Sequence, residues 1–414
     1  MTVFSTILVA NRGEIASRVM RSAQKMGIKC VAVYVEADKN APYLTQADQS
    51  VKLDTNYLDA DAILNAAIMT RSEAIHPGYG FLSENADFAS AVEQSGLIWI
   101  GPSASAISKM GDKLEAKAIT EGAGLPTLPI ALTESDIDSI GFPLLIKASA
   151  GGGGKGMRIV NSAKELADSV KMAQSEAQKA FGDDTVFFES YIKKSRHIEI
   201  QILGDHYGNI IHLGERECSI QRRHQKIIEI APAPNLSESV RQQLTDAAVK
   251  LAGTAQYRNI GTIEFLVAGE TFYFIEANAR LQVEHTVTEA VTGQDLVQLQ
   301  FDLAQGKSLQ SLGLDSEMSA VPRGFAIQVR INMETMGEDG GVRPSGGRLA
   351  AFDIPFGPGI RVDTFGYAGY QTSPNFDSLL AKLIVHAGNL SFASVVQKTQ
   401  RALTEFKIEG VSTN

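Results

Sequence analysis

The sequence predicts a mixed α/β and α+β fold, with a doubly wound parallel sheet in the N-terminal region and a mostly β region at the C-terminal end. Up to about residue 112, short apolar stretches alternate with stretches of helical period. Residues 113–320 contain consecutive strand patterns around a glycine-rich loop, and residues 321–414 contain short strands separated by turn residues. A length of 414 residues fits three such domains, at 1–112, 113–320 and 321–414.

The N-terminal region opens with a strand, a helix and a strand in immediate succession. Residues 6–10 are apolar, residues 14–26 repeat apolar positions with helical period before Gly27, and residues 29–35 are β-branched. The alternation continues with a helix near 59–70, a strand at 73–76, a helix at 84–95 and a strand at 97–101. Such alternation is typical of a parallel sheet covered by helices.

The central region combines strands and helices in a less regular order. The expected elements are strands at 144–148, 185–190, 197–203, 209–215, 261–267 and 272–277, with helices at 163–180 and 238–256. The last residues of the chain, from Gly410 to Asn414, lack the character of a domain edge. We therefore expect the C-terminal domain to be truncated.

Composition narrows the class of protein. The net charge of −9 disfavours nucleic acid as a partner. No apolar run is long enough to span a membrane, and the first ten residues carry neither a basic lead nor a cleavage pattern. Only two cysteines occur, Cys30 and Cys218, so we expect neither a disulfide framework nor a zinc site. These features predict a cytoplasmic protein with no membrane or nucleic-acid partner.

Four consecutive glycines stand within residues 147–157, which read KASAGGGGKGM. Ordering such a run is entropically costly, and its use is the close approach of backbone N–H groups to an anion. The segment differs from a Walker loop, because Met157 follows Gly156 where that motif needs lysine and then serine or threonine. With Lys147 and Lys155 beside it, the run suggests a flap over a triphosphate, and a plain flexible loop is the alternative.

Polar residues of a single parity alternate with apolar ones in residues 275–284, IEANARLQVE. If this stretch is extended, one face carries two carboxylates, two amides and a guanidinium, and a half-solvated strand is the alternative. Glu276 and Asn278 on this face, together with Glu264 from the preceding apolar stretch GTIEFLV, offer oxygen ligands of the kind that Mg²⁺ prefers. Farther along, Arg280 can hold a small planar anion and Glu284 can act as a base.

Two carboxylates can share a metal only if they point to one side of the hairpin that carries them. A two-residue turn at 269–270 would pair Glu264 with Ile275 and send Glu276 to the opposite face. We therefore predict an odd-length turn, or an equivalent bulge, that places Glu264 directly opposite Glu276.

A cationic patch lies within residues 215–229, ERECSIQRRHQKIIE, of this acidic protein. Its members are Arg222, Arg223, His224 and Lys226. Isoleucines follow directly and connect the patch to a core element, although a solvated charge run is the usual explanation of such patterns. We interpret Cys218 as a small buried residue, not as a nucleophile.

Six motifs cover the chain from end to end. They are ANRGEIA (10–16), HPGYGFLSEN (76–85), MGDK (110–113), KASAGGGGKGM (147–157), ERECSIQRRHQK (215–226) and IEANARLQVEH (275–285). Together they resemble the biotin carboxylases of the ATP-grasp superfamily, over essentially the whole length. The resemblance implies an ATP-grasp central domain with a glycine-rich flap and a mobile lid at about 128–203.

The resemblance also implies residue roles. Positions that match ATP contacts are Lys113, Lys147, Gly152, Gly153, Gly154, Lys155, Gly156, Met157, Glu189, Ile192, His197, Gln221, His224 and Leu266. Positions that match magnesium or manganese ligands are Glu264, Glu276 and Asn278. The bicarbonate site corresponds to Arg280, Gln282 and Val283. The implied catalytic residues are Glu284 as general base, Arg280, Lys226 near the phosphates, and Arg330, which stabilises the biotin enolate.

The implied reaction is ATP- and bicarbonate-dependent carboxylation of biotin through carboxyphosphate. No Ala-Met-Lys-Met attachment site occurs, so biotin is expected as a substrate on a carrier domain, with a carboxyltransferase as a further partner and a homodimer or higher oligomer as the assembly. An acyl-CoA carboxylase is favoured as the parent enzyme, and pyruvate carboxylase is the alternative. At positions 286 and 230, the residues Thr286 and Ile230 resemble those of pyruvate carboxylases more closely. Two more distant alternatives for the function are another ATP-grasp ligase and an inactive ATP-binding scaffold. The segment after Asn332 departs from the family pattern.

Overall fold

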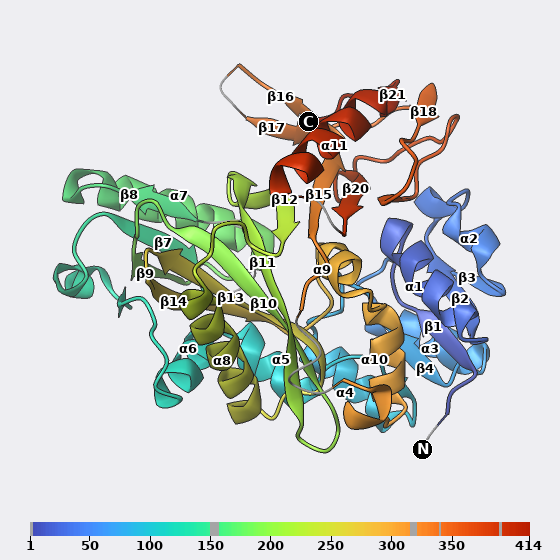
Figure 1. Cartoon of the computed structure of the whole chain (residues 1–414), viewed down its shortest axis with the longest axis horizontal. Coiled ribbons are helices and arrows are strands. Elements are labelled where there is room, and N and C mark those ends of the chain that lie inside the picture. The colour runs from blue at the N-terminus through green and yellow to red at the C-terminus, as the bar shows by residue number, and fades with distance from the viewer. Residues whose placement is uncertain (1–2, 150–156, 315–320, 339–340, 389–390) are drawn as a thin grey trace.

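The computed structural model of the chain describes residues 3–149, 157–314, 321–338, 341–388 and 391–414 (Figure 1). Three sheets organise these residues. A parallel sheet lies in the N-terminal region, a large antiparallel sheet crosses the middle of the molecule, and a small sheet lies on the side away from the N-terminal region. Among the described residues, no helix combines the length and the hydropathy that a membrane crossing requires.

The N-terminal sheet has five parallel strands in the order β3-β2-β1-β4-β5. They are β1 (Thr6–Val9), β2 (Lys29–Tyr34), β3 (Gln49–Lys52), β4 (Ala74–His76) and β5 (Ile98–Trp99). Ile7 packs with α1 (Gly13–Lys25) on one face, whereas Leu8 packs with α3 (Ala60–Met69) and α4 (Ala86–Gln94) on the other. The predicted doubly wound sheet is confirmed. Strand β3 escapes prediction, because its sequence QSVK is polar and its residues lie at an exposed edge.

The large sheet has eight antiparallel strands in the order β14-β13-β10-β11-β12-β15-β20-β19. They are β10 (Arg196–Gly204), β11 (Ile210–Arg222), β12 (Gln225–Ala231), β13 (Asn259–Ala268), β14 (Thr271–Asn278), β15 (Phe325–Asn332), β19 (Ile360–Thr364) and β20 (Leu379–Ala387). The pairing of β12 with β15, in which Ile228 lies opposite Val329, joins the central and C-terminal regions in one sheet. Residues from both regions can therefore face one site.

The small sheet contains β6 (Ile130–Ala131), β7 (Leu144–Ala148), β8 (Arg158–Val160) and β9 (Val186–Ser190) in the order β6-β9-β7-β8. Helix α7 (Ala163–Phe181) covers it, with Val170 and Ala173 against Leu144, Ile146 and Phe188. The lid predicted at 128–203 includes most of strand β10. That strand lies in the large sheet instead, because it pairs along its length with β13.

Helices connect and cover these sheets. They are α5 (Ala104–Gly111), α6 (Lys113–Gly122), α8 (Glu238–Thr254), α9 (His285–Thr292), α10 (Leu296–Ala304) and α11 (Phe392–Glu405). Short strands β16 (Glu334–Met336), β17 (Val342–Pro344), β18 (Ala351–Asp353) and β21 (Lys407–Glu409) complete the C-terminal region. Helix α11 lies outside the predicted elements, although its buried residues Val395, Thr399 and Ala402 follow a helical period and pack on β15 and β20.

Gly324 precedes β15 and sets how closely β15 approaches the end of β20. Its φ is +71°, and a Cβ atom there would lie 2.0 Å from the backbone oxygen of Ala387. Replacing Gly324 with alanine is expected to lower the free energy of unfolding by about 3 kcal/mol, from left-handed strain and from the clash. Gly208→Ala is the matched control, because Gly208 has φ +87° and nothing near its Cβ position, so its cost is about 1 kcal/mol. Urea titrations in which the two variants unfold alike would contradict this account.

Candidate active site

The hairpin of β13 and β14 brings two carboxylates face to face. Its turn consists of Gly269 and Glu270. Between this turn and Glu264 the register shifts, which leaves Ile275 as the extra residue of a β-bulge and sets Glu264 directly opposite Glu276. Directly paired residues share a face of the sheet. The predicted bulge, with both carboxylates on one side, is confirmed.

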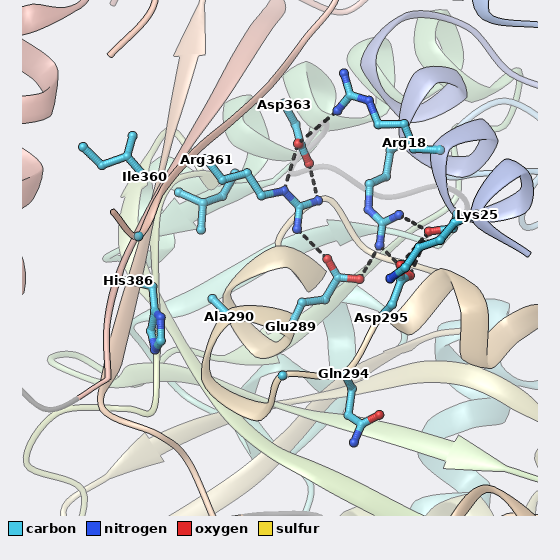
Figure 2. A pocket seen from close by; sticks show the side chains of 15 residues that line it. Arg18, Lys25, Glu289, Ala290, Gln294, Asp295, Ile360, Arg361, Asp363 and His386 are labelled. Atoms are coloured by element: carbon cyan, nitrogen blue, oxygen red, sulfur yellow. Dashed lines mark hydrogen bonds and ion pairs between the residues drawn. The ribbon is translucent and has the colours of Figure 1, made fainter. Parts of the chain in front are cut away.

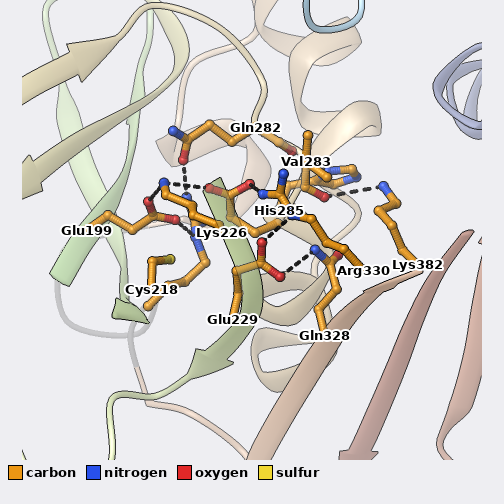
Figure 3. A network of polar contacts seen from close by, with 12 residues as sticks. Glu199, Cys218, Lys226, Glu229, Gln282, Val283, His285, Gln328, Arg330 and Lys382 are labelled. Carbon is orange, nitrogen blue, oxygen red and sulfur yellow. Dashed lines mark hydrogen bonds and ion pairs between the residues drawn. The ribbon is translucent and has the colours of Figure 1, made fainter. Parts of the chain in front are cut away.

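Lys226, on β12, lies at the centre of a buried polar cluster (Figure 3). Its Nζ donates to Glu199 Oε2 at 2.5 Å, to Glu264 Oε1 at 2.8 Å and to Glu284 Oε1 at 2.8 Å. Burial by itself lowers the pKa of Lys226, but the carboxylates around it raise that pKa well above its usual range. The ammonium is therefore charged. It connects β12 to strands β10 and β13 and to the residue that precedes α9.

Glu284 immediately precedes α9 and has a cation at each carboxylate oxygen. Oε1 accepts from Lys226, and Oε2 accepts from Arg330 Nη2 at 2.9 Å. Arg330, on β15, also donates from Nε to Glu229 Oε1 at 2.5 Å. Burial raises the pKa of Glu284, but Lys226, Arg330 and Arg216 outweigh it and hold that pKa far below its usual range. The carboxylate is ionised at neutral pH, and each oxygen keeps a second lone pair for a ligand or a proton.

Glu264 and Glu276 differ in their surroundings although they are neighbours. Glu264 Oε1 accepts from Lys226, Asn278 Nδ2 and Gln282 Nε2, and its Oε2 lies 2.5 Å from His197 Nε2. Lys226 and His197 outweigh the effect of burial and hold the pKa of Glu264 well below its usual range. Burial, and then the charge of Glu264, raise the pKa of Glu276. Among the described residues, no side chain donates a hydrogen bond to the Glu276 carboxylate.

The strand of alternating polar residues ends earlier than predicted. An extended segment over 275–284 is wrong beyond Asn278, because β14 ends there and residues 279–284 form a loop. Asn278 and Gln282 both donate to Glu264 Oε1, at 2.9 and 2.7 Å. Residues four apart in a strand would be separated by about 13 Å, so this convergence requires the chain to turn.

Arg280 is held at the start of this loop by residues from two regions. Its Nε donates to Glu84 Oε2 at 2.8 Å, and its Nη2 donates to Asn278 Oδ1 at 2.9 Å. Val283, also predicted as a site residue, accepts from Lys382 Nζ through its backbone oxygen at 3.2 Å. The loop at 279–284 thus gathers the three residues predicted for a small anion beside Glu284.

Several residues predicted for ATP lie around Glu276. Lys147 forms an ion pair with Glu189, and Lys113 Nζ donates to the backbone oxygen of Ala148 at 3.0 Å. Burial raises the pKa of Glu276, whereas the charges of Lys113 and Lys147 lower it, so these groups act on one another. Lys147 from the small sheet and Lys113 from α6 therefore place two positive charges near the carboxylate of Glu276.

The other predicted ATP positions lie at or near the ends of strands in the large sheet and the small sheet. His197 Nδ1 lies 3.0 Å from Gln221 Nε2, and His197 pairs with Leu266 across β10 and β13. His224 occupies the tip of the β11–β12 hairpin with φ +65°, a strained conformation often found at functional sites. Positions at the ends of β9 and β8 are Ile192 and Met157. Five predicted residues lie outside the described part of the chain: Gly152, Gly153, Gly154, Lys155 and Gly156.

Three family models match consecutive parts of the chain. They are the N-terminal domain of biotin carboxylase at residues 3–107, the ATP-binding domain of the carbamoyl-phosphate synthase L chain at 112–312, and the C-terminal domain of biotin carboxylase at 328–414. A biotin carboxylase of Allochromatium vinosum is 45% identical, over 99% of this chain and 92% of its own length. The chain belongs to the biotin carboxylase family. The resemblance, the fold class and the enzyme class of an ATP-dependent ligase are confirmed.

Other relatives of this biotin carboxylase chain occur in different enzymes. One of the pyruvate carboxylase subunits of Methanothermobacter thermautotrophicus is 46% identical, over 99% of this chain and 85% of its own. The biotin carboxylase domain of 2-oxoglutarate carboxylase from Hydrogenobacter thermophilus, solved with MgADP and bicarbonate, has a TM-score of 0.94 and 42% identity, and the match covers 100% of this chain and 92% of that one. The chain spans 36% of human mitochondrial pyruvate carboxylase, to which it is 46% identical.

The biotin carboxylase site contains buried groups that sequence reasoning missed. Glu199 is fully buried and bonds Lys226, and Glu229 is fully buried and bonds Arg330. The pattern His-Ile-Glu-Ile-Gln at 197–201 alternates polar and isoleucine residues, a signal that could have identified Glu199. Glu229 has a similar signal, because it lies between Ile228 and Ile230, but its partner Arg330 lies 101 residues away and cannot be predicted from this local pattern.

The oxygens of Glu264, Glu276 and Asn278 fit a divalent cation that also binds phosphate. They share one side of the hairpin, and Glu276 has no donor among the described residues, so its charge is available to a metal. A second group of potential metal ligands contains Glu199, Cys218 and Glu284. The Lys226 ammonium already bonds both carboxylates of that group, so we assign no metal to it.

A separate pocket of about 420 Å³ lies between α1, α9 and β19 (Figure 2). Its arginines are paired: Arg18 bonds Asp295 and Glu289, and Arg361 bonds Glu289 at 2.7 Å and its neighbour Asp363. Glu289 lies on α9, just over one helical turn after Glu284. The pocket's ion pairs therefore fix the helix whose N-terminal end carries the site.

Proposed function

We propose that the chain carboxylates biotin held on a carrier, using ATP and bicarbonate, through carboxyphosphate. One observation supports this most: the ionised Glu284 carboxylate lies between Lys226 and Arg330. Lys226 also touches Glu264 on the metal side, and Arg330 belongs to the C-terminal region. A single carboxylate therefore connects the groups expected to act on ATP with the group expected to act on biotin.

The first step is attack of a bicarbonate oxygen on the γ-phosphorus of ATP, with ADP as the leaving group. Arg280 and Gln282 hold bicarbonate, and Glu284 accepts its proton. Because Lys226 and Arg330 hold the pKa of Glu284 low, this carboxylate is a weak base. The proton therefore moves only as the new phosphorus–oxygen bond forms. A divalent cation on Glu264, Glu276 and Asn278 would neutralise charge on the phosphates.

In the second step carboxyphosphate breaks into carbon dioxide and phosphate. The phosphate trianion takes the proton from the ureido nitrogen of biotin, and that nitrogen then attacks carbon dioxide. Arg330 would stabilise the ureido oxygen as it gains negative charge. Because carboxyphosphate is unstable in water, the small sheet is proposed to close over the site as a lid. The glycine run at 151–154, which the family resemblance assigns to this lid, lies outside the described residues.

The test is the dependence of ATP cleavage on both small substrates. With purified protein and Mg²⁺, ADP release should require bicarbonate and should rise further with free biotin. A ligase that joins other substrates would release ADP without response to biotin, and an inactive scaffold would bind ATP without cleaving it. Either result would contradict the proposal.

Loss of one proposed metal ligand should change the Mg²⁺ requirement. Glu276→Gln removes the charge that has no donor among the described residues, so we expect the half-saturating Mg²⁺ concentration for ATP cleavage to rise about tenfold or more. Glu270→Gln, in the turn of the same hairpin, is the matched control. Identical Mg²⁺ titrations for the two variants would rule out Glu276 as a ligand.

The final carboxyl acceptor belongs to the parent enzyme's second half-reaction. An acyl-CoA is favoured by the family resemblance, and pyruvate is the second candidate. The hydroxyl of Thr286 donates to Gln328 Oε1, and the amide of Gln328 donates to Glu229 Oε2 at 2.9 Å. By the family resemblance, acyl-CoA carboxylases usually have proline at this position and pyruvate carboxylases have threonine. Proline would remove the hydroxyl, so this contact supports the pyruvate alternative. Carboxylation assays of the enzyme with its carrier and carboxyltransferase, with pyruvate and acyl-CoA thioesters compared, distinguish the two.

The proposed partners are the biotin carboxyl carrier domain and the carboxyltransferase, on the same longer chain or on separate subunits. We further propose a homodimer or higher oligomer in the cytoplasm. Relatives support the first point, since the family includes both separate subunits and domains of longer chains.

A further inference from the structure

Arg216 lies at the centre of the candidate site, although the motifs imply no role for it. It is on β11 and fully buried, and all five of its N–H groups donate hydrogen bonds. Nε donates to Glu199 Oε1; Nη1 to Gln201 at 2.7 Å and Thr288 at 3.0 Å; Nη2 to Thr262 at 3.1 Å and Gln282 at 3.0 Å. The acceptors come from β10, β13, α9 and the loop at 279–284.

One of these bonds fixes which way the amide of Gln282 points. A guanidinium can only donate, so Oε1 of Gln282 must face Arg216. Nε2 then faces Glu264 Oε1 at 2.7 Å, an ionised carboxylate that can only accept. Both neighbours specify the same orientation, which directs the amide hydrogens toward the metal and anion side of the site.

A second bond supports the position of Lys226. Glu199 is fully buried, with one oxygen bonded to Arg216 and the other to Lys226 Nζ at 2.5 Å. A carboxylate between two cations keeps its charge without water. Arg216 thus acts on both sides of Glu284, through Glu199 and Lys226 on one side and through Gln282 on the other.

We infer that Arg216 is a positioning residue for the small-anion site, which orients Gln282 as a donor to bicarbonate and holds Glu199 and Lys226 around Glu284. This inference rests on the proposed function. It assigns a role to a residue whose five N–H groups all donate to protein acceptors. It also predicts that the fork of the guanidinium, and not its charge alone, is what the site requires.

The test is the kinetics of Arg216→Lys in the bicarbonate-dependent ATP cleavage assay. Lysine keeps the charge but cannot hold Glu199 and Gln282 at once, so the KM for bicarbonate should rise about tenfold or more while the KM for ATP stays within about twofold. Arg241→Lys is the matched control, because Arg241 also donates to a buried carboxylate of the large sheet, Glu215, but lies outside the polar cluster. Its KM for bicarbonate should not change.

Each outcome decides a different point. If the wild-type protein shows no bicarbonate-dependent cleavage, the proposed function fails. If the wild type is active but Arg216→Lys shifts both KM values alike, or neither, the positioning role alone is wrong. Should Arg216→Lys not fold, Thr262→Val removes one acceptor of Nη2 at nearly constant shape. It should raise the KM for bicarbonate selectively by about threefold, and an unchanged value would overturn the inference.

Discussion

Glu284→Gln is expected to lower bicarbonate-dependent ATP cleavage by about 10²- to 10⁴-fold, the usual effect of losing a general base. Glutamine retains the shape of the side chain and can still accept from Lys226 or Arg330, which bond the two carboxylate oxygens in the wild type. It cannot take the proton of bicarbonate. Initial rates of ADP release, at saturating ATP and over a range of bicarbonate, measure the effect.

The control for this variant is Glu215→Gln. Glu215 is a buried carboxylate on β11 that bonds Arg241 and the backbone of Ala233, outside the polar cluster. It tests whether removing a buried charge from the same sheet is enough to reduce activity. Near wild-type cleavage by Glu284→Gln, or an equal loss in Glu215→Gln, would exclude Glu284 as the base.

Arg330→Ala should separate the two half-reactions. We expect biotin carboxylation to fall about 10²-fold or more, because Arg330 is the proposed donor to the developing oxyanion of biotin. ATP cleavage without biotin should fall by less than about tenfold, since Lys226 remains on Glu284. The contact of Arg330 with Glu284 at 2.9 Å explains why some loss of cleavage is expected at all.

Two controls accompany Arg330→Ala, because that change leaves the buried Glu229 without its ion pair. Arg330→Lys keeps a cation near Glu229 and should fold normally while still reducing carboxylation. Arg241→Ala removes a guanidinium from another buried carboxylate, Glu215, and should affect neither half-reaction. Equal loss of both half-reactions in Arg330→Ala and Arg330→Lys would show that Arg330 serves bicarbonate or the fold instead.

Sequence patterns predict the parts of the fold that rest on local signals. The strand at 144–148 and the helices at 163–180 and 238–256 follow apolar periodicity, and the structure places them within two residues of those bounds. The bulge in the β13–β14 hairpin follows from the requirement that Glu264 and Glu276 share a face. In both cases the information lies within one or two neighbouring elements.

Tertiary contacts decide the parts that sequence patterns could not predict. The loop at 279–284 interrupts an alternation typical of a strand, because Gln282 bonds Glu264 and Arg280 bonds Glu84 from another domain. In the sequence Arg216 is one charge among several in a basic segment, and only its five acceptors from four elements reveal its place in the site. Such convergence has no periodic signature in the chain.

The most direct test of the central claim is the fate of the bicarbonate oxygens. Bicarbonate labelled with a heavy oxygen isotope is mixed with the protein, ATP, Mg²⁺ and biotin, and the phosphate is analysed by mass before label exchanges with water. Attack by bicarbonate on the γ-phosphorus predicts one labelled oxygen in each phosphate released, and labelled carbon from bicarbonate on biotin. Phosphate without label, formed at the same rate, would show that water is the nucleophile and would contradict the carboxyphosphate route.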